Sequence, residues 1–215
     1  RLMQPPAKGF VKNWRVYRSR FIDPIRIGAG VRFWNANADT LARAEREYGV
    51  PAEIIVGIIG VETIYGKHMG NYTTFAALTT LAFDYPPRAK LFRQELVELL
   101  LLAREENRPV LSYKGSYAGA LGWPQFMPSS RRKYALDFNN DGKIDLTTSP
   151  VDAIGSAAHR RRSAYRAGGG VRPSPPMPRG SSPRLRGPLA PGFISASCLR
   201  CSGVRTSKIW RSTLT

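Results

Sequence analysis

The chain has 215 residues, of which 42% are hydrophobic and 22% are charged, a composition typical of one globular domain plus an appendage rather than of a wholly disordered chain. It contains no run of about 18 apolar residues, so no membrane-spanning helix is predicted, and residues 1–10 contain no apolar signal core. The formal charge of +18 raises the question of a nucleic-acid partner.

The positive charge is concentrated toward the C-terminus. Twelve of the 33 basic residues lie between Arg160 and Arg211, and no acidic residue follows Asp152. Residues 1–159 therefore carry a net charge of only +6, which would suit association with an anionic wall polymer. No nucleic-acid recognition motif is present, so we expect no specific nucleic acid as a partner. Salt-sensitive, nonspecific binding through the tail is the alternative.

Helical patterns alternate with short loops over residues 1–158. The predicted helices, each marked by apolar residues at helical spacing, are Asn35–Tyr48, a helix from Pro51 through Glu62, Phe75–Phe83 and Ala89–Arg104. The last of these carries a broad apolar stripe of Leu91, Phe92, Leu96, Leu99 and Leu100. No convincing alternating strand is found, so the sequence predicts a mainly α domain.

Residues 159–215 form a basic tail rich in Arg, Pro, Ser and Gly, a composition that cannot easily bury a core. Three interpretations are open: a disordered or irregular basic tail, a tether to an anionic polymer, and out-of-frame translation of a GC-rich gene. The abrupt loss of acidic residues favours the third. Cys198 and Cys201 form a lone C-x-x-C in this tail, without the second pair that a zinc site needs.

Glu62 lies on the apolar face of the second predicted helix, one turn after Ile58 and two turns after Ile55. Burial disfavours the charged form of a carboxyl group and raises its pKa. A carboxyl that is protonated near neutral pH is what a general acid for glycosidic cleavage requires. The alternative is a glutamate at the edge of the core, paired with Lys67 or Arg88.

Four motifs in order extend the interpretation of Glu62. They are GIIGVETIYG at Gly57–Gly66, LAFDYPPR at Leu81–Arg88, KGSYAGALGWPQFMPSS at Lys114–Ser130 and VDAIGS at Val151–Ser156. Together they closely resemble the membrane-bound lytic transglycosylase B family, over roughly residues 10–158. This resemblance implies a lysozyme-like helical catalytic domain at residues 1–158. It also implies that the domain is incomplete, because the family's domain continues past the position of Ser156.

The resemblance also implies roles for individual residues. It places the family's catalytic acid on Glu62, and its substrate-binding positions on Tyr17, Arg88, Ser116, Tyr117, Gln125 and Met127. Of the family's consecutive arginine pair only Arg88 is kept, because Pro87 replaces the other. The serine and glutamine side chains suit sugar hydroxyl and N-acetyl groups, and the glycines and alanines between them allow a ligand to approach the backbone.

The implied reaction needs a single carboxylate. Ordinary glycoside hydrolases use two, and Asp84 is the only possible second group that we identify here. In the implied reaction Glu62 protonates the oxygen between N-acetylmuramic acid and N-acetylglucosamine, then acts as base toward the muramyl 6-hydroxyl, which closes a 1,6-anhydro ring. A muramidase-type hydrolase and a non-catalytic peptidoglycan-binding module remain as alternatives.

Residues 137–152 resemble an EF-hand calcium loop. Oxygen donors stand at its first, third and fifth positions, a glycine at the sixth and a backbone carbonyl at the seventh. Thr148 stands where a glutamate is expected, but related enzymes close a longer loop with a later aspartate. The predicted structural calcium ligands are Asp137, Asn139, Asp141, Lys143 and Asp152, with a solvated turn as the alternative. No organic cofactor is expected.

The remaining expectations concern partners and compartment. The resemblance implies peptidoglycan glycan strands as the partner, the periplasm as the compartment, and a monomer. Peripheral membrane association is expected only of full-length relatives, because no lipid-attachment cysteine lies near Arg1.

Overall fold

The computed structural model describes residues 13–167. By its internal contacts the chain divides into two compact units, residues 1–17 with 177–215 and residues 18–176. In the first unit, Trp14 and Tyr17 stack at a centroid distance of 5.8 Å in the short helix α1 (Trp14–Ser19). The helices and strands from Pro24 onward belong to the second unit. Within residues 13–167, no helix is long and apolar enough to cross a membrane.

Helix α3 (Ala38–Tyr48) stands where a helix over Asn35–Tyr48 was predicted, and it is preceded by α2 (Pro24–Ala36), for most of which no helix was predicted. That prediction was wrong at its start, because Asn37 leaves the helical conformation and its side-chain amide donates to the Phe33 carbonyl at 2.8 Å. Asparagine competes in this way with helical hydrogen bonds. The predicted end of this helix at Tyr48 is confirmed, since Gly49 adopts a φ of 66° and caps α3.

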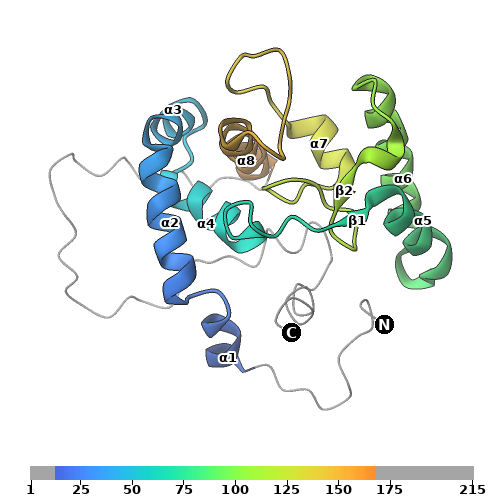
Figure 1. Cartoon of the computed structure of the whole chain (residues 1–215), viewed down its shortest axis with the longest axis horizontal. Coiled ribbons are helices and arrows are strands. Elements are labelled where there is room, and N and C mark those ends of the chain that lie inside the picture. The colour runs from blue at the N-terminus through green and yellow to red at the C-terminus, as the bar shows by residue number, and fades with distance from the viewer. Residues whose placement is uncertain (1–12, 168–215) are drawn as a thin grey trace, which may run out of the picture. The chain divides into compact units, whose positions relative to one another are not determined.

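Helix α4 (Ala52–Thr63) matches the second predicted helix, and it packs between α2 and the long C-terminal helix α8 (Pro150–Ala167) (Figure 1). Ile55 and Ile59 are fully buried on it, as its periodicity predicts. The core around these two residues also contains Phe33, Leu41, Ala44, Val50, Phe138, Ile154 and Ala158.

The second half of the unit is built around a helical pair, α5 (Thr74–Asp84) and α6 (Ala89–Glu105), joined by the 3-10 turn η1 (Pro86–Arg88). Both helices were predicted within two residues. The apolar stripe of α6 is narrower than predicted, because Leu91 and Leu100 are 37% and 47% exposed. The main helical partners of α6 are α5 and α7, and they cover only part of the predicted stripe.

A two-stranded antiparallel sheet connects the two halves. β1 (Tyr72–Thr73) pairs with β2 (Lys114–Gly115), which follows a second 3-10 turn, η2 (Val110–Ser112). The loop after β2 leads to α7 (Pro128–Tyr134). Glu95 of α6 is buried and accepts hydrogen bonds from the Ser129 amide at 3.0 Å and its hydroxyl at 2.6 Å, which fixes the end of this loop.

Helix α8 runs to Ala167 and so continues through position 158, where the composition placed the end of the domain. The stretch between α7 and α8 contains the predicted calcium loop (Figure 1). The predictions for most of the tail fall on residues 168–215, which lie outside the described residues.

Candidate active site

Glu62 lies in the last turn of α4, where the chain leaves the helix through an unusual backbone conformation. Ile64, Tyr65 and Gly66 all have positive φ values, of 51°, 56° and 81°. Consecutive residues in this region are strained unless they are glycine, and such strain is concentrated at functional sites. The last turn of the helix is therefore held in a defined shape next to its carboxylate.

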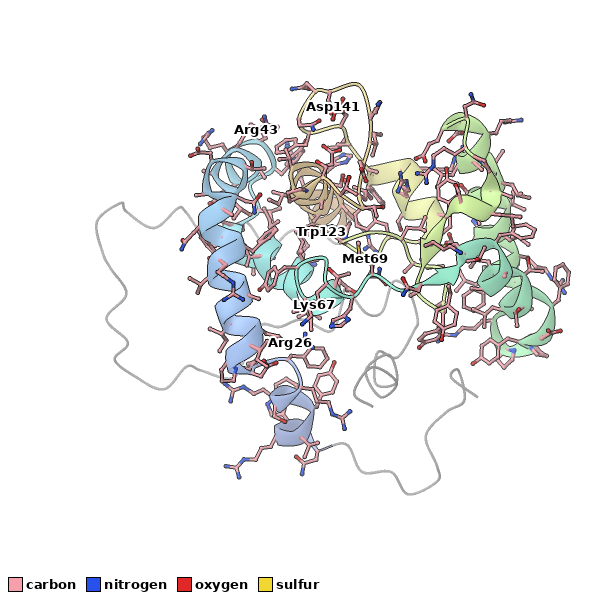
Figure 2. All side chains as sticks on the ribbon, in the orientation of Figure 1. Arg26, Arg43, Lys67, Met69, Trp123 and Asp141 are labelled. Carbon is pink, nitrogen blue, oxygen red and sulfur yellow. The ribbon has the colours of Figure 1, made fainter. Side chains whose placement is uncertain are left out.

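Hydrogen bonds tie this turn to a second segment. The Thr63 hydroxyl donates to the Trp123 carbonyl at 3.0 Å and accepts from the Gly66 amide at 3.0 Å. A Cβ on Gly66 would lie within 2.6 Å of the Trp123 ring, so the indole packs directly on the turn. Figure 2 shows Trp123 above the segment that follows α4.

Burial raises the pKa of Glu62 to about 7, and the nearby positive charge of Arg160 opposes this rise. The residue is only partly buried, but the protein around it disfavours the charged form of its carboxyl enough to raise the pKa. None of the ion pairs among the described residues includes Glu62, which argues against the alternative of a salt bridge at the edge of the core. The carboxyl is thus able to hold or release a proton near neutral pH.

The loop from Lys114 to Met127 contains four of the six predicted substrate residues. The Ser116 hydroxyl accepts from the amides of Ala118 and Ala120 at 3.3 and 3.0 Å. Ser116 thus stabilises the turn of this loop, and its O–H remains a possible donor. The Tyr117 side chain is half-buried, which raises the pKa of its phenol.

Gln125 links this loop to the turn after Glu62. Its amide group donates to the Met69 carbonyl at 3.2 Å and to the Gly122 carbonyl at 2.9 Å, while its backbone has a φ of 49°. Its side-chain oxygen is thus left to accept a hydrogen bond. Met127, two residues later, occupies the N-cap position of α7 without a side-chain hydrogen bond to the helix.

The other predicted residues lie elsewhere. Arg88 ends η1, in the turn between α5 and α6. Asp84, the possible second carboxylate, is exposed at the end of α5. Tyr17 belongs to the first compact unit and is described only within it.

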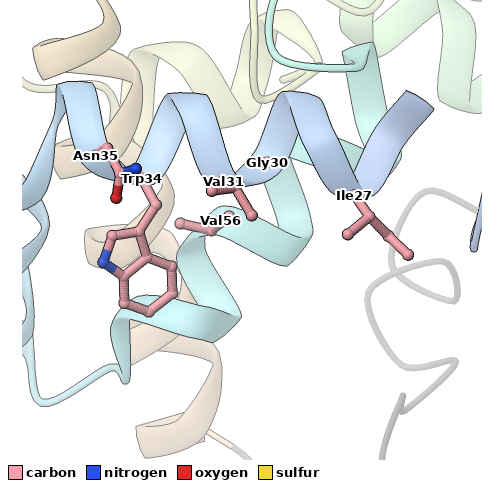
Figure 3. Close-up of a pocket in the computed structure, with 6 residues that line it drawn as sticks. All are labelled: Ile27, Gly30, Val31, Trp34, Asn35 and Val56. Carbon is pink, nitrogen blue, oxygen red and sulfur yellow. The ribbon is translucent and has the colours of Figure 1, made fainter. Parts of the chain in front are cut away.

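An apolar groove of about 370 Å³ lies between α2 and α4 (Figure 3). Its lining is Ile27, Gly30, Val31, Trp34, Asn35 and Val56, and it includes no titratable side chain. The groove therefore offers no acid or base, whereas the end of α4 carries the Glu62 carboxyl.

The predicted calcium loop is closed by hydrogen bonds that its own carboxylates accept. Asp137 accepts from the Gly142 amide at 2.7 Å, and Asp141 accepts from the Lys143 amide at 2.9 Å and the Asn139 side chain at 2.9 Å. Carboxylate and amide oxygens are the hard donors that calcium prefers in proteins. The described residues contain no group of three or more acidic, His or Cys side chains gathered for a metal.

Asp152 closes this loop from the inside. It is fully buried, and it accepts from the Phe138 and Asn139 amides at 2.9 and 3.3 Å and from the Asp145 amide at 2.9 Å. Both ends of the loop therefore meet at one carboxylate.

The helical fold and the carboxyl at the end of α4 define a protein of the lysozyme-like class, and comparison with known proteins narrows this. Residues 1–184 match the model of the transglycosylase SLT domain, so the chain belongs to the transglycosylase SLT domain family. It is 53% identical over 154 residues to the membrane-bound lytic murein transglycosylase B of Escherichia coli, covering 72% of this chain and 42% of that protein.

Two solved structures show the same fold. Soluble lytic transglycosylase SltB1 from Pseudomonas aeruginosa matches with a TM-score of 0.73 and 57% identity, over 80% of this chain and 56% of that one. The Escherichia coli lytic transglycosylase Slt35 in complex with calcium matches with a TM-score of 0.69 and 47% identity, over 88% and 60%. The chain thus spans about half the length of the relatives it matches.

Sequence reasoning missed Arg160, which it counted among the charges of the tail. The signal was present in the spacing, because Arg160 follows the buried Ala153 and Ala157 at seven and three residues, on one face of a helix. It also missed the wedge that Tyr65 forms between Gly30 and Gly60, which only the structure reveals.

Proposed function

We propose that the chain is a peptidoglycan lytic transglycosylase with Glu62 as its acid and base. The observation that carries this proposal is the burial of the Glu62 carboxyl, which raises its pKa to about 7 at the strained end of α4. Membership in the family and the names of the matched relatives support it.

The proposed reaction begins with transfer of the Glu62 proton to the oxygen between N-acetylmuramic acid and N-acetylglucosamine. The bond from this oxygen to C1 of the muramyl sugar breaks, and the N-acetylglucosamine side leaves with the oxygen as a hydroxyl group. The resulting carboxylate then removes the proton of the muramyl 6-hydroxyl, whose oxygen attacks C1 of the same sugar and forms a 1,6-anhydro ring. Water is not consumed, and the intramolecular attack benefits from proximity. A pKa near 7 suits both steps, because the two forms of the carboxyl are close in free energy at neutral pH.

The loop from Lys114 to Met127 is the proposed glycan-binding segment. Ser116 offers a hydroxyl donor, Gln125 offers a carbonyl acceptor, and Tyr117 and Met127 offer apolar surface on the same segment. Tyr17 and Arg88 remain proposed contacts on the strength of the motifs alone. The proposed partner is the glycan strand, the proposed compartment is the periplasm and the proposed state is a monomer.

The products distinguish this proposal from its closest alternative. We expect mass spectrometry of peptidoglycan digested by this chain to show 1,6-anhydromuramyl ends, because the internal hydroxyl takes the place of water. A digest that contains reducing ends alone would instead identify a muramidase. Retention of the chain on intact peptidoglycan without any cleavage would identify a glycan-binding module.

We also propose that the loop at residues 137–152 binds a structural calcium ion, through Asp137, Asn139, Asp141 and the Lys143 carbonyl, with Asp152 as the predicted fifth ligand. The calcium complex of the matched Slt35 structure supports this. Millimolar calcium is expected to raise the unfolding temperature by several degrees, since a ligand at about 100 times its Kd adds about 2.7 kcal/mol.

The control for the calcium prediction uses two exposed aspartates. Asp141→Asn should reduce the calcium-dependent rise, whereas Asp39→Asn on α3 should leave it unchanged. An unfolding temperature that does not respond to calcium in the parent chain would contradict the metal site and would leave the glycan-cleavage proposal untouched.

A further inference from the structure

One cation stands out among the helices that pack against α4, which are α2, α3 and α8. Arg26 on α2 and Arg43 on α3 each form an ion pair with a carboxylate of their own segment. The pKa of Glu62 carries the effect of Arg160 on α8 and of neither of the other two. Of these three arginines, Arg160 is therefore the one whose charge opposes the effect of burial on the Glu62 carboxyl.

The position of Arg160 is fixed by packing. Its guanidinium lies 5.0 Å from the centroid of the Phe126 ring, a cation–π distance. Phe126 is 1% exposed and stands between Gln125 and Met127 in the proposed glycan-binding loop. The charge of Arg160 is thus held at the same loop that approaches the turn after Glu62.

Arg160 and Glu62 form no ion pair among the described residues. A direct pair would hold the glutamate permanently as a carboxylate and remove the acid. A cation at longer range acts more weakly, so it leaves the carboxyl protonated in the resting site but assists it once the proton has been given away.

We infer that Arg160 is a positioning residue of the acid–base site: anchored over Phe126, its charge stabilises the Glu62 carboxylate that forms when the glycosidic oxygen is protonated. This inference rests on the proposed function for its role in turnover. The effect of the Arg160 charge on the Glu62 carboxyl does not depend on turnover and can be measured directly.

The test is an NMR titration of the chain carrying 13C-labelled glutamate side chains, with Glu62→Gln to assign the Glu62 signal. In Arg160→Gln and in Arg160→Met we expect the Glu62 midpoint to rise by at least about 0.5 pH unit, because a favourable charge is lost. Arg160→Lys should bring it back toward the parent value. Arg162→Gln removes the same charge from the same helix, where Arg162 contacts the Glu47 carbonyl, and should leave the midpoint unchanged.

A Glu62 midpoint that is the same in the parent, Arg160→Gln and Arg160→Met would overturn the inference. An equal rise in Arg162→Gln would also overturn it, since the effect would then come from net charge alone. If the midpoint moves as expected while the parent cleaves no peptidoglycan, the electrostatic inference stands and the proposed function fails. If the chain is active, the basic limb of its pH profile of kcat/KM should move to higher pH in Arg160→Gln, together with the Glu62 midpoint.

Discussion

Glu62→Gln is expected to reduce the cleavage of peptidoglycan by about 10³- to 10⁴-fold, the upper part of the range for general acid–base catalysis. The effect is large because one carboxyl is proposed to serve both as acid and as base. Glutamine keeps the size and the hydrogen-bonding shape of the side chain but neither gives nor takes a proton. Release of soluble anhydromuropeptides, followed over time, measures the loss.

The same substitution is expected to stabilise the folded chain at alkaline pH. Since the pKa of Glu62 is raised from 4.5 to about 7, the folded state holds this proton more tightly than the unfolded state. Stability therefore falls as pH rises from about 4.5 to about 7, by up to about 3 kcal/mol. Glu62→Gln removes this penalty, so its gain in unfolding free energy should be full at pH 8 and absent below pH 4.

Denaturant unfolding at pH 4 and pH 8 checks the gain, with Glu53→Gln as the control. Glu53 lies exposed in the first turn of the same helix, where its loss should change stability by less than about 1 kcal/mol at either pH. A Glu62→Gln variant with full activity would remove this residue from the mechanism. Equal stability of the parent and Glu62→Gln at pH 8 would show that the pKa of the Glu62 carboxyl is not raised.

The amphipathic periodicity of the sequence was sufficient for the helices whose neighbours cover one continuous face. Residues 51–62 and 89–104 were placed to within about a residue because Ile55, Ile59, Phe92 and Leu99 repeat at helical spacing and are all fully buried. The break at Asn37 was not predicted, because apolar spacing continues across it. A single side-chain hydrogen bond to Phe33 decides it.

The site was predictable only in part for a related reason. Periodicity placed Glu62 on an apolar face, and the motifs placed Ser116 and Gln125 in one segment. The contacts that join these segments run through backbone groups, such as the Trp123 carbonyl that receives the Thr63 hydroxyl. Every residue type has a backbone carbonyl, so the sequence does not indicate which residue will accept such a hydrogen bond. The attachment of the loop to the end of α4 is therefore visible only in the structure.

Two glycines of α4, Gly57 and Gly60, are expected to change the free energy of unfolding in opposite directions when each is replaced by alanine. A Cβ on Gly57 would meet nothing within 4 Å, whereas one on Gly60 would lie 2.7 Å from Cζ of Tyr65. The Tyr65 ring is wedged between Gly60 and Gly30 of α2 and packs on Phe33 at 5.1 Å. The wedge therefore requires a hydrogen atom in place of a side chain at Gly60.

Gly57→Ala is accordingly expected to raise the free energy of unfolding by about 0.5–1 kcal/mol, since alanine is the better helix former and the site is open. Gly60→Ala should lower it by about 1–3 kcal/mol through overpacking, and should also lower cleavage, because Tyr65 helps to shape the turn after Glu62. Urea unfolding of both variants measures the contrast within one helix.

A double-mutant cycle identifies the cause of the loss in Gly60→Ala. Adding Tyr65→Phe removes the hydroxyl that lies nearest to the new methyl group, so the double variant should recover part of the lost stability, giving a coupling of about 0.5 kcal/mol or more. Strict additivity of the two substitutions would mean that the clash lies elsewhere. If Gly60→Ala proved as stabilising as Gly57→Ala, Tyr65 would not occupy the wedge, and the strained turn that holds Glu62 would need another support.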